Sequence, residues 1–104
     1  NGIAVMTYNQ RDIAGILAMI RHLGATVGLR ETVEEIASSY ERRLMDLRNA
    51  KKALARPQVY FEEWNLPIIT KIKWVSELIE IAGGADVFSE LSSNEAATDR
   101  IVSS

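Results

Sequence analysis

The sequence predicts a helix-rich α/β fold, because three stretches with helical periodicity alternate with two short segments rich in β-branched and aromatic residues. The chain has 104 residues, which suits a single domain. Its residues are 47% hydrophobic and 25% charged, as in ordinary globular proteins, and its net charge of -2 creates no general attraction for nucleic acid.

The first elements are a short strand and an amphipathic helix. Residues 3–7 form an apolar run that predicts a buried strand. Asn9 is then expected to cap a helix that has Asp12 in its first turn, and Gly24 is expected to stop it just after Leu23. The apolar face of this helix consists of Ile13, Ile16, Leu17, Ile20 and Leu23.

The second helix is predicted to be long. Thr32 and Glu35 have the spacing of a capping box, and the apolar stripe continues to about Leu54. A helix over residues 32–54 would measure about 34 Å at 1.5 Å per residue. Its basic residues lack interleaved aromatic side chains, so we interpret them as a solvated face and predict no nucleic-acid partner; they are Arg42, Arg43, Arg48, Lys51 and Lys52.

The remaining chain predicts a mixture of short elements. Residues 58–62 are aromatic and β-branched and predict the second strand, and residues 63–67 predict a loop. A third helix is expected at 71–82, a short extended piece at 86–88 and a helical fragment near 96–102. Two strands cannot satisfy each other's backbone groups if they lie apart, so we expect the isolated chain to form a homodimer through strand edges.

Two segments carry a resemblance to a known family. They are residues 56–67, Arg-Pro-Gln-Val-Tyr-Phe-Glu-Glu-Trp-Asn-Leu-Pro, and residues 74–88, Trp-Val-Ser-Glu-Leu-Ile-Glu-Ile-Ala-Gly-Gly-Ala-Asp-Val-Phe. Together they resemble the start of the second lobe in helical-backbone substrate-binding proteins, the family of cobalamin- and ferric-siderophore-binding components of ABC importers. The resemblance covers nearly the whole chain.

The resemblance implies part of a two-lobed protein. Residues 1–31 would be the end of the first lobe, residues 32–55 the helix that joins the lobes, and residues 56–104 the start of the second lobe. Such a protein is a non-enzymatic receptor that captures a cobalamin-like or ferric-chelate ligand between its lobes. It passes the ligand to an ABC permease and works in the periplasm or another extracytoplasmic compartment.

Candidate ligand-binding residues follow the two predicted strands. Ligands of α/β proteins bind beyond the carboxyl ends of strands, and Glu62, Glu63, Trp64 and Asn65 occupy that position after the second strand. The resemblance places this loop at the cleft between the lobes. There the face of Trp64 would suit a corrin or catecholate ring, the amide of Asn65 would form hydrogen bonds, and Tyr8 would reach the cleft from the first lobe. The alternative is that Trp64 packs beneath the loop and the glutamates are merely solvated.

No catalytic residue, metal site or cofactor is predicted. The chain has no cysteine, and His22 is its only histidine, so it lacks the ligands of an ordinary zinc site. Neighbouring strand residues point to opposite faces, which separates Glu62 from Glu63 and excludes an acid/base pair between them. One alternative to a receptor is a helical interaction or scaffolding module without a small ligand. Another is an enzyme on a similar two-lobed, chelatase-like scaffold, which would need a catalytic histidine or a metal cluster in addition.

Overall fold

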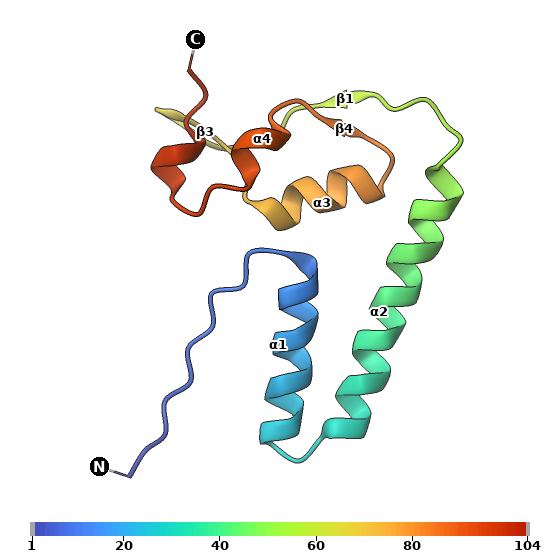
Figure 1. Cartoon of the computed structure of the whole chain (residues 1–104), viewed down its shortest axis with the longest axis vertical. Helices are drawn as coiled ribbons and strands as arrows, with labels where there is room; N and C mark the ends of the chain where they lie inside the picture. Colours follow the sequence, from blue (N-terminus) through green and yellow to red (C-terminus); the bar gives the residue numbers. More distant parts are fainter. Residues whose placement is uncertain (1, 104) are drawn as a thin grey trace.

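The computed structural model describes residues 2–103 as a helical hairpin attached to a small α/β lobe (Figure 1). The helical hairpin consists of α1 (Ile13–Thr26) and α2 (Arg30–Lys51). The lobe contains β1 (Gln58–Val59), β2 (Glu62–Asn65), β3 (Ile68–Thr70), α3 (Lys73–Ile81), β4 (Ala85–Asp86), α4 (Ser89–Ser92) and the 3₁₀ helix η1 (Ala97–Arg100). The molecule measures 50 × 40 × 17 Å, so it is a thin slab.

The predicted helix α1 is confirmed, but both of its predicted ends are wrong. Asp12 caps it, with its carboxylate accepting a hydrogen bond of 2.7 Å from the backbone N–H of Gly15, so Asn9 is not the cap. This hydrogen bond lowers the pKa of Asp12. Gly24 does not stop the helix, which continues to Thr26. The turn that follows uses Gly28, whose φ of 78° is favourable only for glycine.

The long helix α2 is confirmed as the longest element of the chain, with different boundaries. It begins at Arg30, after Leu29, so the Thr32 and Glu35 pair lies within the first turns and forms no capping box. Its last residue is Lys51 and not Leu54. The sharp turn at Gly28 starts the helix sooner than the side-chain pattern indicated.

Gly24 and Val33 set the closest approach between α1 and α2. A Cβ atom on Gly24 would lie 2.0 Å from Cγ2 of Val33, which is far inside van der Waals contact. Next to this crossing, Arg21 of α1 donates hydrogen bonds of 2.8 Å to both Glu34 and Glu41 of α2. These hydrogen bonds lower the pKa of both carboxylates. α1 and α2 are therefore held together by close packing and by the ion pairs of Arg21 with Glu34 and Glu41.

Two small sheets form the lobe. β1 and β4 are parallel, with Gln58 opposite Ala85 and Val59 opposite Asp86. β2 and β3 form an antiparallel β-hairpin around the cis Leu66–Pro67 bond. The predicted strand 58–62 is thus divided between β1 and β2, and the predicted loop 63–67 is largely strand. Pro67 permits this arrangement because it lies in the turn and not within a ladder.

The predicted strand at residues 3–7 is wrong. This segment has no regular secondary structure, and Ile3 and Val5 are about 80% exposed. A strand needs a neighbour to bind its backbone groups, and the sheets described within residues 2–103 pair only β1 with β4 and β2 with β3. Figure 1 shows the N-terminal segment running beside α1 instead.

The predicted third helix is confirmed as α3, which is shorter by a residue or two at each end. The extended piece predicted at 86–88 corresponds to β4, which begins one residue earlier. The C-terminal fragment is a 3₁₀ helix, and the short helix α4 before it was not predicted. Four residues are too few for helical periodicity to identify such an element.

A buried ion pair lies at the centre of the lobe. The ammonium group of Lys71, just after β3, pairs with the carboxylate of Asp86 in β4, and both side chains are inaccessible to solvent. The same carboxylate accepts hydrogen bonds from the hydroxyl of Ser76 in α3 and from the backbone N–H of Phe88. The Lys71 ammonium also lies 5.9 Å from the centre of the Phe88 ring. One polar network therefore joins β3, α3 and β4.

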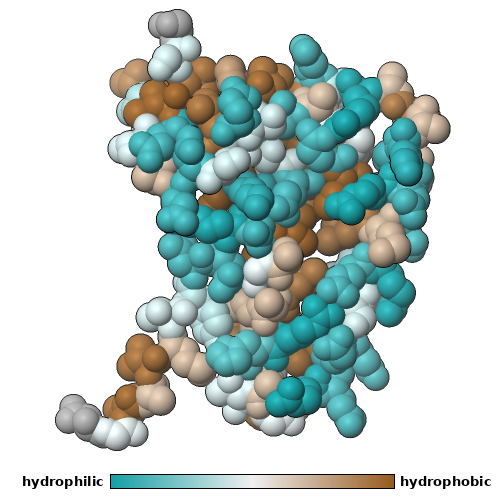
Figure 2. Space-filling view, viewed as in Figure 1, coloured by the Kyte–Doolittle hydropathy of each residue, from teal (hydrophilic) through white to brown (hydrophobic). Residues whose placement is uncertain are grey.

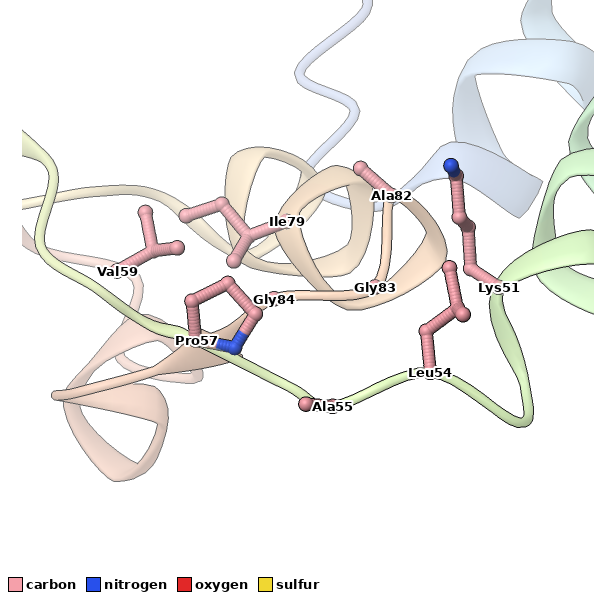
Figure 3. Close-up of a pocket in the computed structure, with 9 residues that line it drawn as sticks. All are labelled: Lys51, Leu54, Ala55, Pro57, Val59, Ile79, Ala82, Gly83 and Gly84. Carbon is pink, nitrogen blue, oxygen red and sulfur yellow. The ribbon is translucent and has the colours of Figure 1, made fainter.

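A junction connects α2 to the lobe through residues 52–57. It surrounds a hollow of about 390 Å³, with Lys51 and Leu54 on one side and Val59 and Ile79 on the other (Figure 3). Gly83 has a φ of 93° and a Cβ atom there would lie 3.0 Å from Cβ of Lys51. Arg56 crosses the junction, pairing with Glu80 and donating a hydrogen bond of 2.8 Å to the carbonyl of Gly84.

The apolar core is small. Within residues 2–103, the buried apolar side chains are those of Leu17, Ala37 and Ile81. Apolar surface is visible between the helical hairpin and the lobe in Figure 2. The radius of gyration is 16.8 Å, against about 13 Å for a compact domain of 100 residues. The exposed helix faces are therefore large in comparison with the core.

Replacing Gly24 with alanine is expected to destabilise the helical hairpin. The new methyl group would overlap Val33, and overpacking of this kind costs about 1–3 kcal/mol. Urea unfolding, monitored by circular dichroism, measures the change in the free energy of unfolding. A Val33→Ala background removes the two nearest atoms, Cγ1 and Cγ2, and leaves Cβ of residue 33 at 2.7 Å, so part of the loss should disappear in the double variant. Equal losses in both backgrounds would show that the crossing is not tightly packed.

Replacing Asp86 with alanine is expected to lower the free energy of unfolding by about 3–5 kcal/mol, because it leaves the charge of Lys71 buried without a partner. A double variant, Lys71→Met with Asp86→Ala, removes both charges and should lose less than the sum of the two single changes. Urea unfolding of the four proteins measures this coupling. Additive losses would contradict a direct interaction.

Candidate ligand-binding β-hairpin

The β-hairpin of β2 and β3 follows the carboxyl end of β1, with Tyr60 and Phe61 as the connection. Glu62, Glu63, Trp64 and Asn65 together make up β2, so the structure brings these four candidate residues into one strand. All four are exposed. The β-hairpin therefore projects from the strand end at which ligands of α/β proteins bind.

Trp64 does not pack beneath the β-hairpin. Its side chain is 60% exposed, and its indole N–H donates a hydrogen bond of 3.1 Å to the carbonyl of Leu66. This bond occupies the polar group of the indole within the turn, so the exposed part of the ring is apolar. Leu66 itself is 84% exposed beside it. The tip of the β-hairpin consequently offers a flat hydrophobic surface.

Glu62 and Asn65 are the polar groups at the two ends of β2. Glu62 accepts a hydrogen bond of 3.0 Å from the hydroxyl of Tyr60. Partial burial and this hydrogen bond raise the pKa of Tyr60 above its ordinary value. Asn65 is exposed beside the turn, opposite Ile68 in the ladder. Both residues are exposed polar groups of the strand that contains Trp64.

Glu63 occupies a β-bulge. The ladder pairs Glu62 with Thr70 and Trp64 with Ile69, so Glu63 is the extra residue of its strand. A bulge interrupts the alternation of side chains and redirects the extra residue. Both carboxylate oxygens of Glu63 accept hydrogen bonds of 3.3 Å from Arg100 of η1. Glu63 thus contacts a buried guanidinium, unlike the other residues of β2.

Tyr8 lies apart from the β-hairpin. Its hydroxyl is 2.6 Å from Nδ1 of His22, and the two rings meet edge to face with centroids 5.8 Å apart. The N-terminal segment that contains Tyr8 runs beside α1 in Figure 1, away from β3. Within this chain Tyr8 and β2 therefore form no common site.

Two larger hollows lie between the helical hairpin and the lobe. One has a volume of about 650 Å³ and is lined mainly by apolar side chains of α1, α2 and α3, including Trp74. The other, of about 730 Å³, combines apolar residues with charged ones such as Glu41, Arg48 and Glu77. The residues of β2 line neither hollow. Trp74 is 36% exposed and lines the first of these hollows.

Two residues of the candidate site escaped sequence analysis. Tyr60 was assigned only to a strand, yet its hydroxyl binds Glu62. Arg100 was assigned to a polar C-terminal fragment, yet its side chain is only 3% exposed and contacts Glu63, 37 residues away. The presence of Tyr60 two residues before Glu62 is only a weak sequence indication of their hydrogen bond. No local sequence pattern indicates the contact between Arg100 and Glu63.

The part of the chain that the structure describes contains no cluster of three or more histidine, cysteine, aspartate or glutamate side chains suited to a metal ion. Of the helices between residues 2 and 103, none combines the length and the apolar character that crossing a membrane requires.

Comparison of the chain with curated proteins and with solved structures finds no significant match. A family model described as periplasmic binding protein matches residues 1–102, which is nearly the whole chain. This match agrees with the helix-rich α/β fold and with the resemblance carried by residues 56–67 and 74–88. The chain therefore belongs to the periplasmic binding protein family.

Proposed function

We propose that this chain is part of a solute receptor that captures a cobalamin-like or ferric-chelate ligand for an ABC importer. Its family supports a substrate-binding role, which is generally not enzymatic, and implies an extracytoplasmic location. The observation that carries the proposal furthest is the exposed face of Trp64 on a β-hairpin directly after β1.

The surface of the β-hairpin suits a flat ligand that is largely apolar. The Trp64 ring provides a stacking surface, and its N–H group is already bonded to Leu66. Asn65 and the Glu62 carboxylate lie on the same strand and would provide hydrogen bonds at the ligand's edge. A few polar groups around an aromatic surface are typical of small-molecule sites. Tyr8 would contribute from the first lobe only if the ligand spans the distance between the lobes.

We assign three regions to the receptor. Residues 1–31 belong to the end of the first lobe, residues 32–55 to the helix between the lobes and residues 56–104 to the start of the second lobe. The 22 residues of α2 support this division because they form a rod about 33 Å long between α1 and the small lobe. A continuous helix bends little, so we expect only limited closure of the lobes around a ligand.

The partner of such a receptor is an ABC permease in the membrane, and its compartment is the periplasm or an equivalent space. Family membership supports both assignments in general terms. The assignment of a corrinoid or a ferric siderophore as the ligand class rests on the resemblance of residues 56–88.

One observation favours a second function, a helical interaction module. The hollow of about 650 Å³ between α1, α2 and α3 is lined by Ile16, Ile20, Leu47, Trp74 and other apolar residues. A partner helix or a further part of the same protein could fill it. This alternative assigns no ligand to Trp64.

Replacing Trp64 with alanine is expected to weaken ligand binding by about tenfold, because the variant loses the stacking surface. Calorimetric titration of the full-length protein with cyanocobalamin and with a panel of ferric siderophores measures this change. Calorimetry avoids the absorption of these ligands, which distorts tryptophan fluorescence. Trp74→Phe is the matched control, since Trp74 lines the hollow beside α1 and its replacement should leave the affinity unchanged. If no member of the panel binds, the receptor proposal gives way to the interaction module.

The isolated 104-residue chain is expected to form a homodimer through its exposed strand edges and apolar N-terminal segment. Ile3 and Val5 are both about 80% exposed, and each sheet described within residues 2–103 has only two strands. Light scattering over a range of concentrations measures the mass. A Val5→Lys variant should dissociate more readily because it places a charge in the contact. A single monomeric species at high concentration would contradict this expectation.

A further inference from the structure

Arg100 is a buried cation whose donors are shared between two parts of the lobe. One set of hydrogen bonds goes to its own segment, from Nη1 to the carbonyls of Asn94 (3.1 Å) and Glu95 (2.9 Å). The other set goes to the β-hairpin, from Nε to the carbonyl of Thr70 (3.3 Å) and from Nη2 to the carboxylate of Glu63 (3.3 Å). The guanidinium group therefore connects the C-terminal segment to both strands of the β-hairpin.

The backbone that follows Arg100 runs along β3 of the β-hairpin. Ile101 forms an antiparallel bridge with Ile69, and the N–H group of Val102 donates a hydrogen bond of 2.9 Å to the carbonyl of Ile68. These contacts fix the position of η1 relative to β3. The guanidinium thus reaches Glu63 from a backbone that is already held in place.

The geometry requires an arginine and not merely a positive charge. A planar guanidinium carries five N–H donors in fixed directions, and here they serve four separate partners. A lysine ammonium carries only three donors around a single nitrogen atom. It could not serve carbonyls on both sides of the segment and the bulge at the same time.

We propose that Arg100 is a positioning residue for the candidate ligand-binding β-hairpin. It holds the bulge at Glu63 in place and thereby fixes the orientation of the neighbouring Trp64 and Asn65. Glu63 then acts by binding Arg100 and does not contact the ligand. The consequence for ligand binding rests on the proposed function, whereas the effect on the β-hairpin itself does not.

The expected effects are moderate. The side chain of Glu63 is 42% exposed, so solvent screens its ion pair with Arg100. Loss of this contact should loosen β2 without unfolding the lobe, because the buried Lys71–Asp86 pair is separate from it. Changes at Glu63 therefore test the proposal even if variants of Arg100 fail to fold.

The first experiment measures the order of Trp64 without any ligand. A Trp74→Phe background leaves Trp64 as the only tryptophan, since the chain has two. Glu63→Ala removes the partner of Arg100, and we expect lower fluorescence anisotropy and faster acrylamide quenching of Trp64. Glu63→Gln retains a hydrogen-bond acceptor and should restore most of the order. Arg100→Lys should resemble Glu63→Ala, whereas Arg42→Ala, on the exposed face of α2, should change nothing.

The second experiment measures ligand affinity for the same variants by calorimetry, with the corrinoid or ferric chelate that the wild-type protein binds. Glu63→Ala should weaken binding by about two- to fivefold, in line with a partly exposed ion pair, and Glu63→Gln by less. If both variants weaken binding equally while the Trp64 signals are unchanged, Glu63 contacts the ligand directly and the proposal is overturned. Unchanged Trp64 signals in every variant also overturn it. A looser Trp64 in a protein that binds no ligand supports the role of Arg100 and refutes only the receptor function.

Discussion

The buried pair of Lys71 and Asp86 is the interaction on which the lobe depends. Removing two charges from water is costly, and the cost is offset here because the carboxylate has three partners and the ammonium also lies near the Phe88 ring. These partners are Lys71, just after β3, Ser76 in α3 and the backbone of Phe88, after β4. In a chain with so few buried apolar side chains, the directional bonds of this network specify how these elements meet. Such specificity is a recognised role of buried polar groups.

The network at the base of the β-hairpin permits its tip to be exposed. Thr70 is fully buried, and its hydroxyl donates a hydrogen bond of 3.1 Å to the carbonyl of Phe61, so the two strands are held together at their base. Arg100 holds the bulge from the side. Trp64 and Leu66 at the tip are not part of the core and present apolar surface to solvent. A binding surface on a fixed base loses less entropy when it captures a ligand.

Sequence reasoning succeeded where a pattern is local and long. The apolar spacing of residues 13–23 and 33–47 identified α1 and α2. Residues 62–65 were predicted to lie together at the end of a strand and in the loop after it, and the structure places them together in β2. Sequence reasoning failed where the outcome depends on a distant partner. Residues 3–7 have the composition of a strand but no neighbour to pair with, and Arg100 meets Glu63 across 37 residues. The β-hairpin was missed because Glu62 and Glu63 break the alternation of polar and apolar residues that identifies a half-buried strand.

The stiffness of α2 concentrates any movement of the helical hairpin relative to the small lobe in the junction at residues 52–57. A continuous helix resists bending, whereas the junction contains a hollow of about 390 Å³ and lacks a tightly packed core. At this junction a Cβ atom on residue 83 would lie 3.0 Å from Cβ of Lys51, and Arg56 pairs with Glu80 of α3. Both side chains of this ion pair are partly exposed, so solvent weakens it. The junction should therefore yield before α2 does when the helical hairpin and the small lobe move relative to each other.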